Sequence, residues 1–212
     1  GLGTASGDLV LTQADIDYFG TTYSELIFGS LMSGGELRIG GALTFTGPGV
    51  SFQKGDSAPG GVLVLEAGAS VAYSGTGAVR FSAGFMTFSA GSTVDVGSAS
   101  LLEVAADALT LQASPGSLTG SGALVLRSAN PTVDIGVGTA TGTLQITQAV
   151  LDAFGPDFTS LAIGHMGGGV GDITIDGSIV FDAPDVVIRT EGGITLGATA
   201  AAAGGIERSS QS

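Results

Sequence analysis

The stretch VRFSAGFMTFSAGSTVDVGSASLLEVAADALTL, residues 79–111, decides the fold. Within it, pairs of apolar residues separated by one intervening residue recur every seven or eight positions, as Val79/Phe81, Met86/Phe88, Val94/Val96, Leu102/Val104 and Leu109/Leu111. An apolar side chain at every second position is typical of a short β-strand that buries one of its faces. The segments between the pairs are rich in Gly, Ser and Thr, which favour turns. The stretch therefore predicts a succession of short strands joined by tight turns.

Every third pair falls into one column, with a step of about 23 residues along the chain. The first column contains Val62/Val64, Met86/Phe88, Leu109/Leu111 and Val133/Ile135; the second contains Val71/Tyr73, Val94/Val96 and Leu118; the third contains Val79/Phe81, Leu102/Val104 and Leu124/Leu126. Three faces of short strands are the signature of a parallel β-helix, here predicted as an all-β solenoid of about nine three-strand turns. In the third column, Arg80 lies one rung from Glu103, so we expect the two side chains to be neighbours on the surface.

The composition agrees with a turn-rich β fold and argues against some classes of partner. The 212 residues include 38 Gly, and 43% are apolar, which is enough to form a core. The formal net charge of −13 argues against binding to nucleic acid or to an anionic membrane, which requires clusters of Lys and Arg. No Cys is present for a disulfide or a thiolate metal site, and no apolar run approaches the roughly 20 residues of a membrane span. We therefore expect neither nucleic-acid binding nor membrane insertion.

A longer repeat overlies the short one. Residues 7–30 (GDLVLTQADIDYFGTTYSELIFGS) match residues 142–165 (GTLQITQAVLDAFGPDFTSLAIGH) at a constant separation of 135 positions, with ten identities. At about 23 residues per turn, this separation is close to six turns. The predicted organisation is a superrepeat over 7–141 and the start of a second copy over 142–197, both within a single solenoid spanning 1–206, followed by a polar tail over 207–212.

One segment in each copy has the pattern of a short helix. Thr12–Gly20 and Thr147–Gly155 each begin with a Thr suited to capping a helix N-terminus and end in Gly. Each carries two apolar residues three positions apart on one helix face, Ile16/Phe19 in the first copy and Leu151/Phe154 in the second. The sequence predicts two short helical insertions whose apolar faces pack against the coil; a binding protrusion is the alternative.

Residues that could carry catalysis are few and scattered. His165 is the single histidine, no G-x-S-x-G motif occurs, and His165 follows a strand-ending Gly, which favours a polar loop residue. The acid pairs that we considered are Asp15 with Asp17, Asp172 with Asp176, and Asp182 with Asp185. No Lys or Arg cluster is available to bind an acidic sugar, and the few aromatic residues leave little platform for stacking of sugar rings. The sequence therefore predicts no catalytic residue, no cofactor site and no enzymatic activity.

Some of these acids are better candidates for calcium ligands than for catalytic residues. The segment Gly168–Ile173 approaches the calcium-binding pattern G-G-x-G-x-D-x-U-x, but its Asp stands one position early and the pattern occurs only once. Asp172 and Asp176 remain weak candidates for calcium ligands. The favoured interpretation is a solvated turn without a metal.

The repeated block resembles the repeats of very large bacterial exoproteins of the filamentous haemagglutinin type. The resemblance is carried by the L-x-[LI]-T-Q-A-x-[IL]-D-x-F-G start of both copies, by Gly171–Ile175, and by Phe181–Ile188 leading to Gly192-Gly193-Ile194. It implies a right-handed β-helix that is secreted to the cell surface of a Gram-negative bacterium. The implied partners are an outer-membrane export partner for the parent protein and a host or neighbouring-cell surface, or identical subunits end to end.

Two classes of function follow. The favoured one is a non-catalytic structural segment of a secreted bacterial surface adhesin or extracellular fibre. The alternative is a carbohydrate-active β-helix domain, a polysaccharide hydrolase or lyase, that uses Asp172, Asp176 and Asp182 as acid, base or calcium ligands. A long groove lined by carboxylates would favour the enzyme, whereas acids scattered around the rod would favour the scaffold.

Overall fold

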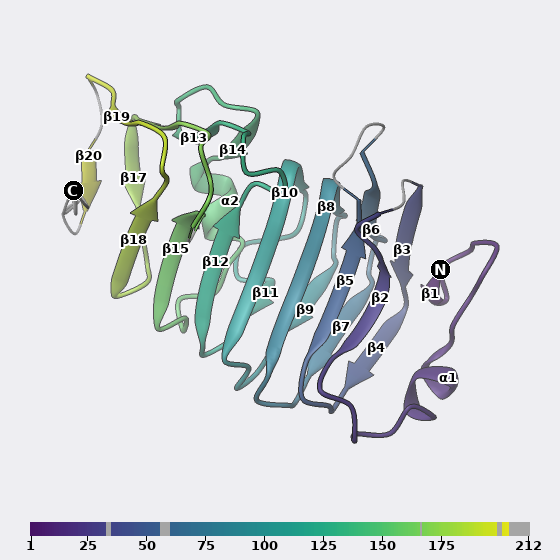
Figure 1. Ribbon diagram of the computed structural model, residues 1–212. Coiled ribbons are helices and arrows are strands. Elements are labelled where there is room, and N and C mark those ends of the chain that lie inside the picture. Colours follow the sequence, from purple (N-terminus) through teal and green to yellow (C-terminus); the bar gives the residue numbers. More distant parts are fainter. Residues whose placement is uncertain (33–34, 56–59, 166, 199–200, 204–212) are drawn as a thin grey trace.

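The computed structural model describes residues 1–32, 35–55, 60–165, 167–198 and 201–203. They form a β-solenoid of short parallel strands stacked along one axis, with very little helix (Figure 1). The predicted parallel β-solenoid is thereby confirmed. The predicted polar tail, 207–212, lies outside the described residues.

The helices are α1 (Gln13–Asp17) and α2 (Gln148–Asp152). The strands are, in chain order, β1 (Leu2–Gly3), β2 (Leu26–Ser30), β3 (Glu36–Gly40), β4 (Ala42–Phe45), β5 (Val50–Lys54), β6 (Val62–Leu65), β7 (Ser70–Tyr73), β8 (Ala78–Phe88), β9 (Thr93–Asp95), β10 (Leu101–Leu111), β11 (Leu118–Thr119), β12 (Ala123–Arg127), β13 (Ile135–Gly138), β14 (Leu144–Ile146), β15 (Ser160–Gly164), β16 (Ile173–Asp176), β17 (Ser178–Val180), β18 (Asp185–Arg189), β19 (Ile194–Leu196) and β20 (Ala201–Ala203).

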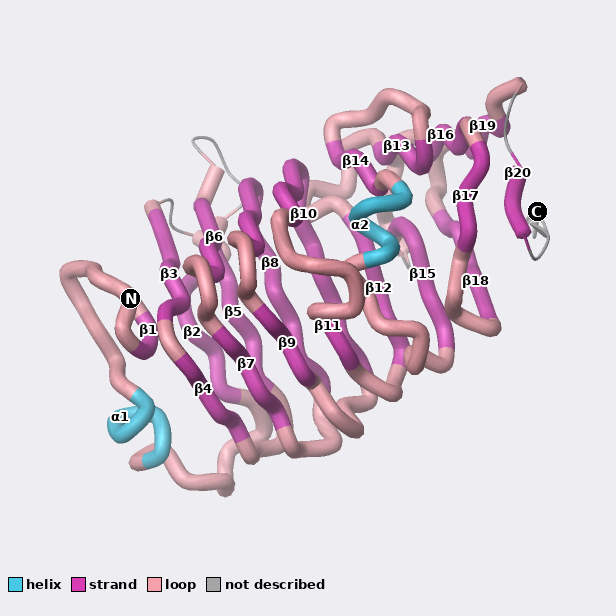
Figure 2. The backbone as a smooth tube through the Cα atoms, turned by 180° about the vertical axis from the view of Figure 1, so that it is seen from behind, coloured by secondary structure: helices cyan, strands magenta, loops and turns pink. Residues whose placement is uncertain are grey.

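The strands form the faces of a coil. The largest sheet has ten strands in the order β1-β3-β6-β8-β10-β12-β15-β18, with β2 and β5 joining it at β8. β8 and β10 are long enough to serve two faces, since the first part of β8 pairs with β5 and the second part with β6. β4, β7, β9 and β11 form a separate sheet on the opposite side (Figure 2). Every described strand pair is parallel, as a coil that always winds in one direction requires.

The structure has about seven turns, so the predicted count of nine is not confirmed. One face shows the stack directly, because β2, β5, β8, β10, β12, β15 and β18 pair successively along it. The chain is much longer between β12 and β15 than between β10 and β12, since β13, β14 and α2 all lie in that one turn. The predicted count assumes about 23 residues in every turn over the whole chain, so it counts the residues of these insertions as additional turns.

Two of the three predicted columns are confirmed in register. In the third column, Leu102 pairs with Val79 on one side and with Leu124 on the other. In the second, Val94 pairs with Val71 and with Leu118. All six side chains are buried in the core.

The first column is wrong at both of its ends. Leu63, and not Val62, pairs with Met86, so Val62 and Val64 lie half-buried on the other face of β6. The segment Val62–Leu65 is apolar at four consecutive positions, and an alternating pattern cannot fix the phase when both faces are apolar. At the other end, Val133 precedes β13, whose Ile135 pairs with Leu144 and Ile173 in a different sheet.

A row of phenylalanine rings fills the centre of the first half of the coil. Phe28, Phe52 and Phe81 occupy the same position on successive rungs, and their rings stack with centroids 5.6 Å and 4.9 Å apart. Phe88 meets Phe81 edge to face at 5.6 Å from the second part of β8. Because in-register pairing places identical residue types one above another, the rings bury their faces against each other.

Both predicted helices are present where the sequence places them. Thr12 and Thr147 cap them by accepting a hydrogen bond from the backbone N–H of the third helical residue, Asp15 and Val150. Ile16 and Leu151 are buried, as predicted.

The predicted packing of the two phenylalanines holds for only one copy. Phe154 is 5% exposed and pairs with Leu118, whereas Phe19 is 48% exposed. The prediction that Phe19 packs against the coil is therefore wrong. The reason is that α2 lies within the stack and α1 lies at its end, next to β4 (Figure 2).

We expect Phe81→Ala to destabilise the fold by about 3–5 kcal/mol, since this ring is fully buried between two others and its removal leaves a cavity. The matched control is Phe85→Ala on the same strand, where the ring is 54% exposed and the loss should be below about 1 kcal/mol. Chemical unfolding followed by circular dichroism measures both. Equal losses would contradict the inward and outward assignment of β8.

Candidate functional site

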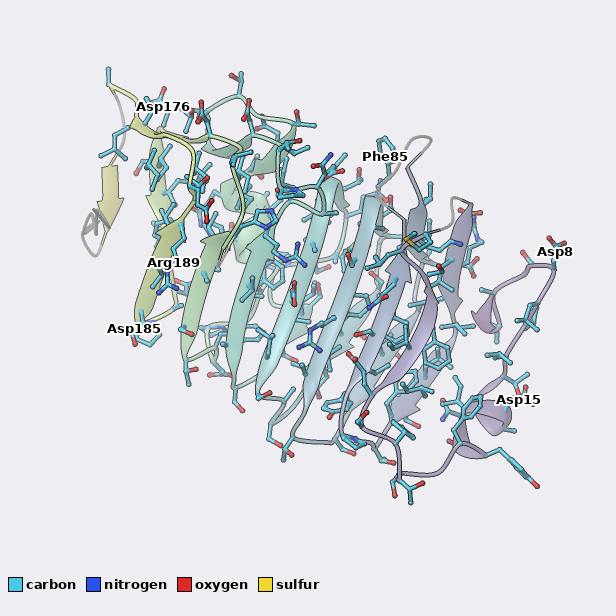
Figure 3. The ribbon with its side chains drawn as sticks, in the orientation of Figure 1. Asp8, Asp15, Phe85, Asp176, Asp185 and Arg189 are labelled. Carbon is cyan, nitrogen blue, oxygen red and sulfur yellow. The ribbon has the colours of Figure 1, made fainter. Side chains whose placement is uncertain are left out.

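An open groove of about 820 Å³ lies on the outer face of the largest sheet. β10, β12, β15 and β18 cross it side by side (Figure 1), and Arg189 lies on β18 at its edge (Figure 3). The outward side chains of these strands alternate with the buried column, because successive residues of a strand point to opposite faces. The apolar lining residues include Leu101, Ala123, Val125, Ala162 and Val187, and the polar ones are Glu103, Arg127, Ser160, His165 and Arg189.

A row of alternating charges crosses the strands, and two of its members, Glu103 and Arg127, line this groove. Glu25 Oε1 lies 2.9 Å from Arg80 Nη1, and Arg80 Nε lies 3.2 Å from Glu103 Oε2. Arg127 Nε donates to the other oxygen of Glu103 at 2.5 Å. The predicted proximity of Arg80 and Glu103 is confirmed, and the pair is directly in register. We call Glu25, Arg80, Glu103 and Arg127 the ion row.

Glu103 is the central residue of the ion row. Its side chain is only 14% exposed and accepts hydrogen bonds from two guanidinium groups, one from each neighbouring rung. The positive charges of the two guanidinium groups offset the negative charge of this carboxylate. Glu103 therefore links three successive rungs and contributes little free negative charge to the groove.

His165 lies at the end of the groove where β15 finishes. Its Nε2 is 2.9 Å from the hydroxyl of Ser128, which is fully buried. Burial lowers the pKa of His165, and the nearby positive charge of Arg127 lowers this pKa further. The imidazole is therefore neutral near pH 7, in a hydrogen bond with a neutral hydroxyl group.

A glycine turn places His165 above the strand end. Gly164 has a φ of 97°, and a Cβ at this position would collide with the carbonyl oxygen of Arg189. Gly29 has the same conformation in the first copy, where Ser30 follows it. The same backbone turn thus presents Ser in one copy and His in the other.

Two features of this groove limit the chemistry that its side chains offer. Ser128 and His165 have the composition of a nucleophile with its base, but the Ser128 hydroxyl is buried and a substrate cannot reach it. Glu103 is held by Arg80 and Arg127. The remaining surface of the groove is aliphatic and is bordered by hydrogen-bonding groups.

The three acids weighed for catalysis or calcium lie outside the groove. Asp172 precedes β16, and its Oδ1 accepts a hydrogen bond of 2.6 Å from Gly193 N–H. Asp176 ends β16 and accepts from Gly177 N–H at 2.9 Å (Figure 3). Asp182 follows β17 beside a pocket of only about 30 Å³.

These acids do not converge on one point. Asp172 and Asp176 flank opposite ends of the same strand, a separation of about 13 Å at the rise of a β-strand. Among the residues that the structure describes, no group of three or more His, Cys, Asp or Glu side chains could hold a metal ion. A calcium ion at Asp172 or Asp176 stays a prediction, and additional ligands there would have to come from backbone oxygens or water.

The hydrogen bond between Ser128 and His165 was missed by the sequence analysis, although a signal for it exists. Leu126 pairs with Ile163 in the third column, so two residues further along each strand Ser128 and His165 must be neighbours. Extending that column by one turn would have located the pair. The long insertion between β12 and β15 conceals the step, because it breaks the spacing of about 23 residues.

Comparisons with known proteins leave the family open. No protein-family model, no curated protein and no solved structure matches this chain. Within the described residues, no helix is long and apolar enough to span a membrane.

We expect acidification to destabilise the fold through His165. The pKa of this residue is lower in the folded chain than the value near 6.5 that it has when unfolded, so the unfolded chain takes up the proton more readily. The contribution of His165 to the free energy of unfolding is therefore fully present above about pH 6.5 and is lost as the pH falls below that value. Tm measured at about pH 7.5 and pH 5.5 should show this loss, which His165→Gln should remove. A pH dependence of equal size in the variant would contradict it.

Glu103→Gln should destabilise the chain by about 1 kcal/mol, because it removes the negative charge between Arg80 and Arg127. The loss should shrink as the ionic strength rises, since salt screens the repulsion that remains. The control is Glu36→Gln, where a single exposed pair with Arg38 at 2.7 Å is broken and roughly 0–0.5 kcal/mol is expected. Urea unfolding at low and high salt tests both, and equal effects would show that the ion row has no joint contribution.

Proposed function

We propose that this chain is a non-catalytic structural segment of a secreted bacterial surface adhesin or extracellular fibre. The observation that carries the proposal is the continuous register of seven strands along one face, from β2 to β18, over a core of stacked apolar side chains. Such a stack is stiff along its axis, because each rung is hydrogen-bonded to the rungs before and after it. At about 4.8 Å per rung, seven turns extend roughly 30 Å along the axis.

The surface chemistry supports a scaffold. The charged residues beside the groove neutralise one another in the ion row, and the acids considered for catalysis are dispersed over other elements. The chain has 19 acidic and six basic residues, and this excess of negative charge favours solubility and disfavours pairing with the sheet edges of unrelated molecules. We infer that the groove and the loops around it are the surface with which the segment contacts its target.

The remaining parts of the proposal follow from the resemblance of the repeated block to exoproteins of the filamentous haemagglutinin type. The coil is right-handed, which is also the sense that parallel strands joined by crossovers overwhelmingly adopt. The chain belongs to a larger parent protein that an outer-membrane partner exports to the surface of a Gram-negative bacterium. Its target there is a host or neighbouring-cell surface.

Changing Asp172, Asp176 and Asp182 together to Asn should leave Tm within about 2 °C of the parent chain, with or without added calcium, because the amide oxygen of Asn can still accept the backbone hydrogen bonds that Asp172 and Asp176 accept. The control is a variant with Asp8, Asp17 and Asp157, all exposed, changed to Asn, which alters the net charge equally. Differential scanning calorimetry gives Tm, and a reducing-end assay on neutral and acidic polysaccharides should show no cleavage by any of the three chains.

Two outcomes would overturn this proposal. A calcium-dependent rise in Tm that only the Asp172/Asp176/Asp182 variant loses would establish a metal site. Polysaccharide cleavage that the same variant abolishes, and the control variant retains, would establish a carbohydrate-active enzyme.

A further inference from the structure

The two repeated segments share a local structure but differ sharply in exposure. Leu9 is 70% exposed, whereas Leu144 at the equivalent position is 2% exposed. Phe19 and Phe154 differ in the same way. The first copy thus presents an apolar surface at the end of the rod, where a terminal cap would carry polar side chains. We call this surface, formed by Leu9, Tyr18, Phe19 and the edge of β2, the N-terminal face.

The second copy shows what covers such a face. Leu118 N–H donates to the carbonyl oxygen of Ala153 at 3.0 Å, and Gly155 N–H donates to the carbonyl oxygen of Leu118 at 2.8 Å. β11 thereby pairs with the end of α2 and buries Phe154. On the adjacent face, β12 pairs in parallel with β15 from Ala123 to Leu126. One rung of the solenoid, β10 to β12, therefore supplies both the apolar cover and the backbone hydrogen bonds.

The N-terminal face already has the conformation that receives such a rung. Gln13 clamps α1 to β4, since its amide accepts from Thr44 N–H and donates to Thr44 O, both at 2.9 Å. Gln148 makes the same two bonds with Val180 at 2.9 Å and 3.1 Å. Among the described strands, β2 pairs only with β5, so its other edge is open where β15 is paired with β12. An open, correctly oriented edge is a site for strand addition.

We propose that the N-terminal face is an interface for a further solenoid rung with the chemistry of residues 101–127. A strand of this rung pairs along β2 as β12 pairs along β15, and a short strand with an apolar residue at the position of Leu118 covers Phe19. The inference deepens the proposed function and rests on it, because it names the neighbour that a rod segment has along its axis.

The occupant is a preceding repeat unit and not the far end of a second copy. β18 pairs with β15 as β5 pairs with β2, so β18 stands at the position of β5 in the repeat. A second copy stacked end to end would present this later rung to α1 instead of the equivalent of β10 to β12. A unit joined to residue 7 in the way that residue 141 is joined to residue 142 supplies the rung in the right phase.

Two substitutions between the copies specify the partner further. Tyr18 is 94% exposed, whereas Ala153 at the equivalent position is fully buried. Asp15 replaces Val150, and its carboxylate accepts hydrogen bonds from the N–H and the hydroxyl of Thr12 at 2.8 Å and 2.7 Å, so burying this charge away from water would still be costly. The partner rung must therefore leave space beside Tyr18 and keep the Asp15 carboxylate in contact with water or a polar group.

The test is a tandem chain in which residues 7–141 are duplicated in place, so that a second copy of α1 follows a β10 to β12 rung. Hydrogen exchange on this chain should show that the amide of Gly20 at the internal junction is protected at least about tenfold more than in the parent chain, as the amide of Gly155 is. In the parent chain, Phe19→Ala should lower Tm by less than about 2 °C, whereas Phe154→Ala should lower it by roughly 10 °C.

At the tandem junction, Phe19→Ala should lower Tm as much as Phe154→Ala does, and Tyr18→Ala should not lower it. An unprotected Gly20 amide at the junction, or a Phe19→Ala effect as small as in the parent chain, would overturn the interface. Dimerisation of the parent chain that Phe19→Asp abolishes in sedimentation would overturn the choice of occupant in favour of a second copy. Polysaccharide cleavage in the presence of a protected junction would refute the proposed function alone.

Discussion

The in-register stacking of parallel strands is the constraint on which the rest of the structure depends. Because Leu102 lies between Val79 and Leu124, every residue on β10 has a fixed neighbour on the rung before and on the rung after. Because successive side chains of a strand point to opposite faces, the apolar side chains fill the interior and the outward positions can carry other residue types. The phenylalanine row and the ion row are two consequences of one register, since both place complementary side chains at the same height on successive rungs.

The helical insertions show how the coil tolerates interruption. α1 and α2 each replace part of a strand, and the amide of Gln13 or Gln148 supplies the backbone-like pairing that a strand would have given to its neighbour. The polar groups of the interrupted sheet thus remain satisfied. After the insertion, the chain returns to the same register, and β15 continues the face that β12 left.

The surface differs from the core in how it relates to function. The core determines that the chain is a rod, whereas we propose that the outer face of β10, β12, β15 and β18 contacts the target. In a solenoid, the outward residue of a rung can change without altering the fold, as Ser30 and His165 after the same glycine turn illustrate. The ends are a third kind of surface, because an uncovered rung exposes both apolar side chains and a pairing edge.

The sequence by itself determined the parallel solenoid, the register of the second and third columns, the two helices and the contact between Arg80 and Glu103, because each depends on spacing along the chain alone. It could not determine the phase of Val62–Leu65, where both faces are apolar, nor the contact of Ser128 with His165, which a long insertion separates. Phe19 and Phe154 occupy matching positions in nearly the same sequence, and only the tertiary structure decided that one is exposed and the other buried. The physical reason is that such a side chain is buried only where a neighbouring rung covers it, and the local sequence does not show whether that rung is present.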